Sequence, residues 1–278
     1  MGRITTRTPV QRVTLDGDQV SVVRRPDTVT VEEPLQVRVD GRPLTVTMRT
    51  PGDDFDLALG FLVGEGLVSG ADDVRTLMHC LDEDADGHPT YNVVDVALSP
   101  GVVLPEVSLE RSFASTSACG VCGTTSIDAV RRRSPYDVAA DRTPIAPQVL
   151  ADLPEALARE QAAFERTGGL HAAGLFTAAG ELLVVREDVG RHNAVDKVVG
   201  WAAREHRLPL AGHVLVVSSR ASFELTQKAV MAGIPCLAAI SAPSSLAIEL
   251  AEQSGLTLVG FLRPPRLSVY AGGDRLGL

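Results

Sequence analysis

Cysteine, aromatic side chains and positive charge are all scarce in this chain of 278 residues. The shortages of cysteine and of positive charge each exclude a class of protein. Four cysteines are too few for a disulfide scaffold, and the arginines and acids within residues 1–23 do not resemble a secretory leader. We therefore expect a reducing, cytoplasmic environment. The net charge of −9 argues against a nucleic-acid-binding surface, which needs clustered Lys and Arg to neutralise phosphates.

Long apolar runs are missing as well. The longest uncharged stretch, residues 229–248, is interrupted by Gly233, Pro235 and Pro243, so it does not predict a membrane span. The only run of basic residues, 131–133, is interpreted as the solvated end of a helix. With 45% hydrophobic residues and few aromatics, the composition favours an α/β protein with an ample core.

Two of the four cysteines lie in one short segment, Cys119-Gly120-Val121-Cys122-Gly123. Thr124 or Thr125 is placed to cap a helix that begins just after this segment. Free amide groups and the positive end of that helix dipole would favour the thiolate, which is the nucleophilic form of cysteine. The segment therefore predicts sulfur chemistry at Cys119 and Cys122.

Three kinds of site fit a single CxxC motif. A zinc site needs further ligands, but the chain has no second CxxC, and no histidine is followed two residues later by the glutamate that zinc deaminases use. A thioredoxin-type dithiol centre needs the motif at the end of a strand, whereas a Ser/Thr-rich loop precedes it here. The third possibility is a cysteine that carries sulfane sulfur as a persulfide. Cys80 and Cys236 lie in apolar segments and are predicted to be inert, buried thiols.

The chain divides by pattern into two predicted domains. Residues 1–110 are predicted to form a small α+β domain, with a hairpin over residues 29–48, a helix beginning after residue 53, and strands over 74–81 and 91–98. The first strands are also candidates to join the core. Residues 111–278 are predicted to form the larger domain, which carries the CxxC loop.

The second domain alternates between strands and helices. After a hairpin over 170–186 and a helix, we expect strands at 213–218, 235–241 and 256–263, joined by helices at 222–232 and 244–253. Strands joined by helices pair in parallel, and ligands bind beyond their carboxyl ends. The fold class expected is α/β, with a mixed and partly parallel sheet.

Polar and basic residues follow each of these predicted strands. The strand ends are Ser218 to Ser222, Ser241 to Ser245, Arg263 to Arg266 and Arg186 to Asn193. Hydroxyls, arginines and helix N-termini at one sheet edge would form a cradle for a nucleotide-like anion, although ordinary helix capping would use the same residues. His192 lies in a polar turn and is a candidate proton shuttle or anion donor. His171 and His213 lie in strand-like segments, and we interpret them as structural.

These motifs, taken in order, resemble the formate dehydrogenase accessory sulfurtransferases, the FdhD family. The resemblance covers nearly the whole chain, and its motifs are specific in combination rather than singly. They are Glu33-Pro34-Leu35, Thr50-Pro51-Gly52-Asp53, Gly60-Phe61-Leu62 with Glu65-Gly66, Ala118 to Gly123, Gly169-Leu170-His171, Arg186 to Lys197, Ser218-Ser219-Arg220 with Ser222 and Glu224, Ser241-Ala242-Pro243 and Gly260-Phe261-Leu262-Arg263.

The resemblance implies a sulfurtransferase that serves formate dehydrogenase. A cysteine desulfurase would load a persulfide onto Cys119, with Cys122 beside it. The sulfur would then pass to molybdenum bis(molybdopterin guanine dinucleotide), bound as a substrate, with no tightly held metal of the protein's own. The resemblance also implies a C-terminal domain of cytidine-deaminase-like fold without its zinc, and a homodimer.

The cofactor-binding residues follow from the resemblance and from the strand ends together. The resemblance places the guanine dinucleotide against the stretch from Phe261 to Arg266, and the strand-end loops add further polar residues. The full set is Phe261, Leu262, Arg263, Pro264, Pro265, Arg266, Ser219, Arg220, Arg191 and His192. Two other functions stay open from the residues alone: a chaperone that holds the cofactor without sulfur transfer, and a dithiol reductase. Gly120 and Gly123 further predict that the segment 115–123 is a moving loop.

Overall fold

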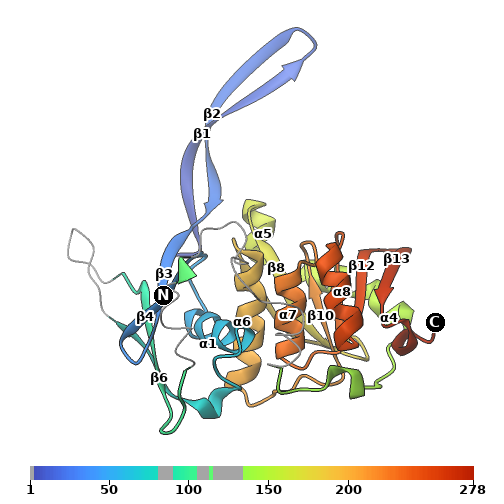
Figure 1. The fold of residues 1–278 in the computed structure, drawn as a ribbon. Helices are drawn as coiled ribbons and strands as arrows, with labels where there is room; N and C mark the ends of the chain where they lie inside the picture. The colour runs from blue at the N-terminus through green and yellow to red at the C-terminus, as the bar shows by residue number, and fades with distance from the viewer. Residues whose placement is uncertain (1–2, 81–89, 105–112, 115–133) are drawn as a thin grey trace.

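The computed structural model describes residues 3–80, 90–104, 113–114 and 134–278 (Figure 1). The CxxC motif, its predicted capping threonines, the predicted moving loop and the basic run 131–133 all lie outside these residues. The predictions made for them stay predictions.

A six-stranded sheet forms the larger part of the molecule, with the strand order β13-β12-β11-β10-β8-β9. Its centre is the predicted alternation of strands and helices, and β10, β11 and β12 pair in parallel as expected. Every residue of β11 is buried, as is typical of a parallel strand covered on both faces. The central elements are β10 (His213–Val217), α7 (Phe223–Met231), β11 (Cys236–Ala239), α8 (Ser245–Ser254) and β12 (Thr257–Arg263).

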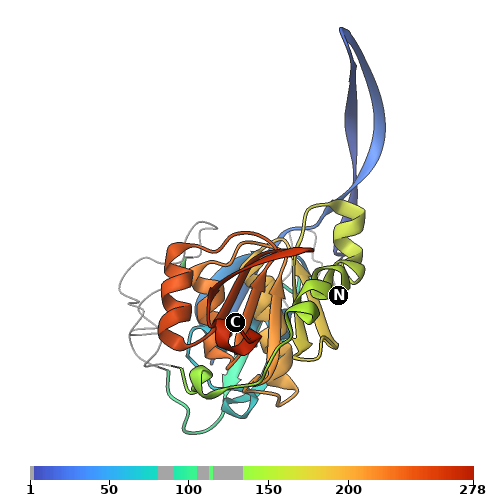
Figure 2. The same ribbon diagram turned by 90° about the vertical axis from the view of Figure 1, so that its right-hand side faces the viewer.

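Antiparallel strands complete this sheet on both sides. The predicted hairpin is formed by β8 (His171–Thr177) and β9 (Leu182–Asp188), and β13 (Arg266–Ala271) pairs with β12. One face of the sheet packs against α4 (Pro147–Arg159), and the other against α6 (Arg191–Arg204), α7 and α8 (Figures 1 and 2). Shorter elements at this end are α5 (Ala162–Thr167), η2 (Val138–Ala140) and η3 (Gly273–Leu276).

A five-stranded sheet, ordered β5-β6-β3-β4-β7, is built mainly from the first hundred residues. It contains the predicted hairpin and the two predicted strands, with α1 packed on its inner face. Its elements are β3 (Glu33–Val39), β4 (Arg42–Arg49), α1 (Asp54–Gly64), η1 (Ala71–Asp73), β5 (Val74–Cys80), β6 (Val93–Leu98) and β7 (Phe113–Ala114).

Helices α1 and α6 join the two sheets by an unusually close crossing. A Cβ atom on Gly60 would overlap the carbonyl oxygen of Asp196, and one on Gly200 would overlap that of Asp56. The two glycines therefore allow the helix backbones to touch. One continuous hydrophobic cluster runs from Leu35 in the five-stranded sheet to Ala271 in the six-stranded one. The boundary at residue 110 stays a prediction.

A long two-stranded hairpin projects away from both sheets (Figures 1 and 2). It consists of β1 (Thr5–Asp16) and β2 (Gln19–Thr30), paired antiparallel through the turn at Gly17 and Asp18. The sequence analysis did not expect these two strands. We call residues 5–30 the arm.

The expected mixed α/β class, with parallel and antiparallel strands in the same sheets, is confirmed. The cytidine-deaminase-like assignment of the C-terminal part stays a prediction. Within the ranges that the structure describes, no helix is both long and apolar enough to cross a membrane.

Candidate functional site

The carboxyl ends of four strands meet at one edge of the six-stranded sheet. β10, β11 and β12 are parallel to one another, and β9 has the same direction because it and β10 both run antiparallel to β8. The loops that follow are bonded together, since the Ser244 amide donates to the Ala221 carbonyl at 2.9 Å and the Phe261 amide to the Ser241 carbonyl at 3.1 Å. The prediction that these loops share an edge is confirmed.

Three helices also begin at this edge. α6 starts after Gly190, α7 after Ser222 and α8 after Ser244. Only the last of these caps uses its side chain, whose hydroxyl accepts from the Ala247 amide at 3.3 Å. Helix N-termini present free amides and the positive end of the dipole, so the edge favours an anionic group.

Arginines from three loops add positive charge here. Arg220, Arg263 and Arg266 are exposed, and the Arg263 Nε donates to the Ile240 carbonyl at 3.1 Å, which fixes the start of its guanidinium. Arg191, in the first turn of α6, has a buried Nε without a hydrogen-bond partner among the described residues. A buried donor of this kind costs stability unless a ligand or water satisfies it.

His192 faces an acidic partner across the gap between α6 and α7. Its Nε2 lies 3.8 Å from Glu224 Oε2 and 3.5 Å from the Ser222 hydroxyl. The interaction with His192 lowers the pKa of Glu224 to about 2. Glu224 is therefore a carboxylate at neutral pH. It was not among the predicted site residues, although its position in the first turn of a helix at a strand end was a usable signal.

A second pair lies one turn deeper between the same two helices. Asp196 follows His192 by four residues and Lys228 follows Glu224 by four, so each pair shares a helix face. Lys228 Nζ lies 2.7 Å from Asp196 Oδ1, and both side chains are buried. Burial raises the pKa of Asp196 to about 6, although the ammonium opposes this shift. The interface between α6 and α7 is therefore polar from the strand-end edge to the buried pair of Asp196 and Lys228.

A buried ion pair between Lys197 and Asp188 connects α6 to the end of β9. Lys197 Nζ lies 2.8 Å from Asp188 Oδ2 and donates to the Thr50 carbonyl at 2.9 Å. Asp188 Oδ1 accepts from the Gly190 amide at 2.8 Å and from the Asn193 side chain at 2.9 Å. These bonds fix the turn that presents Arg191, and they satisfy the oxygens of Asp188, which is fully buried.

His171 belongs to the same edge, which the sequence analysis did not recognise. It begins β8, and the first residue of an antiparallel strand lies at the carboxyl end of its neighbours. Desolvation, followed by the charges of Arg191 and His192, lowers its pKa. His171 is therefore a neutral imidazole at neutral pH, close to Arg191 and His192. Its place at this edge follows from the antiparallel pairing of β8 with β10, which leaves no local signal in the sequence.

Phe261 has a strained backbone at the end of β12. Its φ is 49°, in the left-handed region that non-glycine residues seldom adopt, and 44% of its surface is exposed. The pairing of β12 with β13 is irregular between Gly260 and Arg263, so the bulge turns Phe261 outward. An exposed aromatic ring held in this way can stack on a planar ligand.

The other predicted cofactor residues differ in accessibility. Pro264 and Pro265 are exposed, whereas Leu262 is buried in the core. Ser219 is also buried, and its hydroxyl donates to the Arg220 carbonyl at 3.1 Å. Among the predicted cofactor residues, the exposed ones are therefore arginines, prolines and Phe261.

The described cysteines do not join this edge. Cys236 is buried in β11, where desolvation raises the pKa of its thiol to about 12, so the prediction of an inert thiol is confirmed for it. Cys80 is half-buried at the end of β5. Among the described residues no three His, Cys, Asp or Glu side chains gather as a metal site would require. Cys119 and Cys122 lie outside that search.

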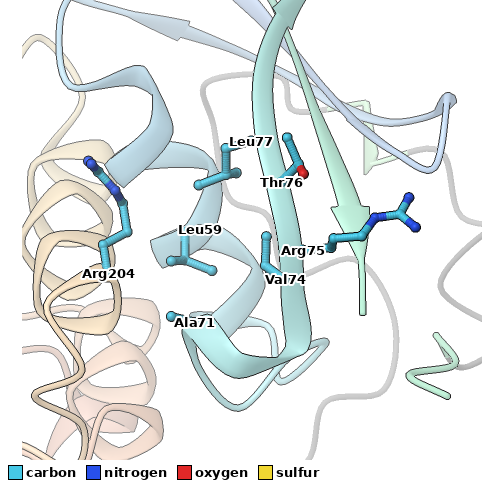
Figure 3. Close-up of a pocket in the computed structure, with 7 residues that line it drawn as sticks. All are labelled: Leu59, Ala71, Val74, Arg75, Thr76, Leu77 and Arg204. Atoms are coloured by element: carbon cyan, nitrogen blue, oxygen red, sulfur yellow. The ribbon is translucent and has the colours of Figure 1, made fainter. Parts of the chain in front are cut away.

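A shallow cavity of about 160 Å³ lies elsewhere, between α1, β5 and the last turn of α6 (Figure 3). Its polar side chains include Arg75 and Arg204, and the latter is bound to Asp56 Oδ1 at 2.6 Å. Arg204 ends the helix that Arg191 begins, so about 20 Å separates this cavity from the strand-end edge. The cavity does not belong to the candidate site.

The sequence model of the family described as FdhD/NarQ matches residues 30–277. This chain belongs to the FdhD/NarQ family. The sulfur carrier protein FdhD of Streptomyces avermitilis is 57% identical to it, with 100% of this chain and 98% of the relative covered. The protein of the same name from Mycobacterium tuberculosis is 56% identical, with 94% of this chain and 95% of the relative covered.

A solved structure agrees with the FdhD/NarQ assignment at the level of the fold. The crystal structure of a protein from Desulfotalea psychrophila, described as a formate dehydrogenase accessory protein, matches with a TM-score of 0.71. The two are 24% identical, and the match covers 97% of this chain and 99% of that one.

Proposed function

We propose that this chain is a sulfurtransferase that carries sulfane sulfur from a cysteine desulfurase to molybdenum bis(molybdopterin guanine dinucleotide), and so supports formate dehydrogenase. The observation that carries the proposal is the strand-end edge, where exposed arginines and three helix N-termini collect in a chain of net charge −9. Positive groups in an acidic protein are expected to serve an anionic ligand. Membership of a family whose close relatives are named sulfur carriers supports the choice of that ligand.

In the first half-reaction, Cys119 attacks the outer sulfur of the desulfurase persulfide. One S–S bond breaks and another forms, so the desulfurase regains its thiol and Cys119 becomes the persulfide without net oxidation. Cys122 assists or resolves this intermediate. The exchange needs the attacking cysteine as a thiolate, as the CxxC sequence predicts.

In the second half-reaction, the strand-end edge binds the guanine dinucleotide part of the cofactor. Arg263 and Arg266 would pair with its phosphates, and Phe261 would stack on the base. Arg191 and His192 are available for a second anionic group. Delivery of the outer sulfur would break the S–S bond and return Cys119 to its thiolate; the sulfur leaves at the sulfane level, so the accepting cofactor would have to supply two electrons to hold it as sulfide. The cytidine-deaminase-like fold and the homodimer belong to the same proposal.

Intact-mass measurement after incubation with a cysteine desulfurase and cysteine tests the first half-reaction. We expect an adduct of about 32 Da that a reductant removes. Cys119→Ala should abolish the adduct, Cys122→Ala should reduce it by a smaller or equal amount, and Cys80→Ala is the matched control that should keep it.

Two results would contradict this function. A protein that never gains sulfur but binds the cofactor would be a chaperone. A protein that only cycles between dithiol and disulfide would be a reductase.

A further inference from the structure

A second cavity, of about 220 Å³, lies between the end of β9, the turn at residues 50–53, helix α5 and the first half of α6. We call it the β9 cavity. It has room for one small organic molecule, but it is smaller than the cavities of about 300–1,000 Å³ that enclose drug-sized ligands. None of the residues predicted to bind the cofactor lines it. It is also distinct from the cavity of Figure 3.

Lys197 forms the most deeply buried part of the wall of the β9 cavity, with only 1% of its surface exposed. A lysine ammonium has three donors. Two of them are used here, because Nζ lies 2.8 Å from Asp188 Oδ2 and donates to the Thr50 carbonyl at 2.9 Å. One donor of a buried cation is therefore left for a ligand.

Arg186 supplies a second donor to the same cavity. Its Nη2 donates to Asp56 Oδ2 at 3.1 Å and its Nη1 to the Val185 carbonyl at 3.2 Å. Its Nε is buried and has no hydrogen-bond partner among the described residues, although Asp53 Oδ2 lies 3.4 Å away as an ion-pair contact. A buried donor in this state costs stability, and a ligand oxygen would recover that cost.

Carboxylates lie at the open side of the β9 cavity. The side chain of Asp53 is 49% exposed, and Glu160 is exposed as well. The third acid of the wall, Glu187, is already engaged, since its two oxygens accept from the Ala163 and Phe164 amides at 2.9 and 2.7 Å. Asp53 and Glu160 are therefore the acids that can meet a cationic group of a ligand.

The charges of the β9 cavity are thus ordered from inside to outside, with donors of two cations inside and two carboxylates at the mouth. The wall between them is apolar and includes Ile4, Pro51, Leu170 and Val185. A simple anion would be repelled by the mouth, and a simple cation by the interior. A zwitterion with a small apolar side chain matches all three parts of the wall.

We propose that the β9 cavity binds a free α-amino acid. Its carboxylate accepts from Lys197 and from the Nε of Arg186, in charge-assisted hydrogen bonds. Its ammonium lies between Asp53 and Glu160, and its side chain contacts the apolar wall. This inference goes beyond the proposed sulfur transfer, because no residue assigned to that reaction lines the cavity.

Isothermal titration calorimetry on the full chain tests the proposal, with L-alanine, L-valine and L-cysteine as probes. We expect saturable binding of at least one of them, with a Kd between about 1 μM and about 1 mM. For L-alanine the matched compounds are propionate, which lacks the ammonium, and ethylamine, which lacks the carboxylate. Each should bind at least about tenfold more weakly than the amino acid.

Asp53→Asn/Glu160→Gln removes the two carboxylates at the mouth and keeps the size of both side chains. Asparagine also tolerates the left-handed backbone of residue 53, whose φ is 54°. This variant should bind the amino acid at least about tenfold more weakly. The matched control is Asp152→Asn/Glu155→Gln, which removes two exposed acids from α4 and should leave the affinity unchanged.

Arg186→Lys tests the inner side of the β9 cavity, because it keeps a cation beside Asp56 but removes the Nε donor. It should also weaken binding at least about tenfold. A thermal unfolding midpoint close to that of the wild type shows that each variant is folded.

The proposal is overturned if none of the three amino acids binds up to about 10 mM, or if propionate binds as tightly as L-alanine. Equal affinity of the two double variants would also overturn it. Sulfur loading of the same samples separates this proposal from the proposed function. Weaker amino-acid binding with normal loading supports the β9 cavity, and failed loading with normal amino-acid binding counts only against sulfur transfer.

Discussion

Single side chains at the strand-end edge decide whether it can hold an anion. Arg263 is already fixed by its bond to the Ile240 carbonyl, so less side-chain entropy is lost when its remaining donors bind a ligand. Arg191 has a buried donor in need of a partner. These features distinguish the edge from ordinary helix capping, which the sequence alone left open.

We predict that Arg263→Ala/Arg266→Ala weakens GDP binding by at least one to two orders of magnitude, because the loss of even one charged hydrogen bond costs about 1.5–3 kcal/mol. Isothermal titration calorimetry measures this directly. The matched control is Arg42→Ala/Arg75→Ala, which removes two exposed arginines from the five-stranded sheet. Unchanged GDP affinity in the first variant would mean that the nucleotide binds elsewhere.

The pair formed by His192 and Glu224 predicts an acid titration. His192→Gln should raise the pKa of Glu224 from about 2 toward its usual 4.5, because the histidine is the main cause of the shift. Carboxyl-carbon NMR, with Glu224→Gln to assign the signal, measures this. His206→Gln, at the other end of α6, is the control and should leave the signal unchanged.

The sign of the stability effect follows from the same shift. A carboxylate whose pKa is lowered on folding stabilises the fold above about pH 4.5, and this contribution is lost as the pH falls through about 2. The His192→Gln variant should therefore be less stable than the wild type at pH 6, with the difference vanishing near pH 2. A difference that stayed constant over this range would show that the pair does not act through charge.

At the scale of elements, the crossing of α1 and α6 depends on two glycines. Gly60→Ala and Gly200→Ala should each destabilise the protein by about 1–3 kcal/mol or more, because the added Cβ overlaps a backbone carbonyl that cannot move aside. Urea unfolding measures the change. Gly70→Ala is the control, since its Cβ would lie 4.0 Å from the nearest described atom, on Leu208.

A small change in the stability of the Gly60 and Gly200 variants would contradict the account of a close helix crossing. It would mean that the two helices separate at little cost. The six-stranded sheet and the strand-end edge would then be only loosely tied to the five-stranded sheet.

The elements that could be predicted from sequence are those whose burial leaves a pattern. The α7–β11–α8–β12 segment alternates between amphipathic helices and apolar strands, so its order, parallel pairing and strand-end edge were all accessible. The place of His171 at the strand-end edge was not predicted because it depends on which strand β8 pairs with. That pairing is a tertiary contact without a local signal.

The arm could not be predicted in the same way because it lacks a buried face. Its side chains are mostly exposed, so no core imposes an alternation on them. The two-residue turn Gly17-Asp18 did carry a hairpin signal, because Gly17 has a φ of 56° and Gly-Asp pairs favour tight hairpin turns. Burial patterns alone therefore miss elements that have no buried face.

At the scale of the whole molecule, the arrangement of positive groups on an acidic protein favours an anionic ligand, while sulfur, molybdenum and formate dehydrogenase come from the family resemblance. No pattern of burial or charge in the described residues specifies a molybdenum cofactor. The resemblance supplied the ligand, and the fold supplied a place where such a ligand would bind.

The central claim is that sulfur passes from Cys119 to a cofactor held at the strand-end edge, and a single-turnover transfer measurement tests it most directly. The protein is loaded with ³⁵S from labelled cysteine and a desulfurase, separated from both, and mixed with molybdenum bis(molybdopterin guanine dinucleotide). We predict that the label moves to the cofactor, and that Arg263→Ala/Arg266→Ala slows this transfer at limiting cofactor without reducing the loading. A label that stays on the protein, or leaves it equally fast without the cofactor, would contradict the account.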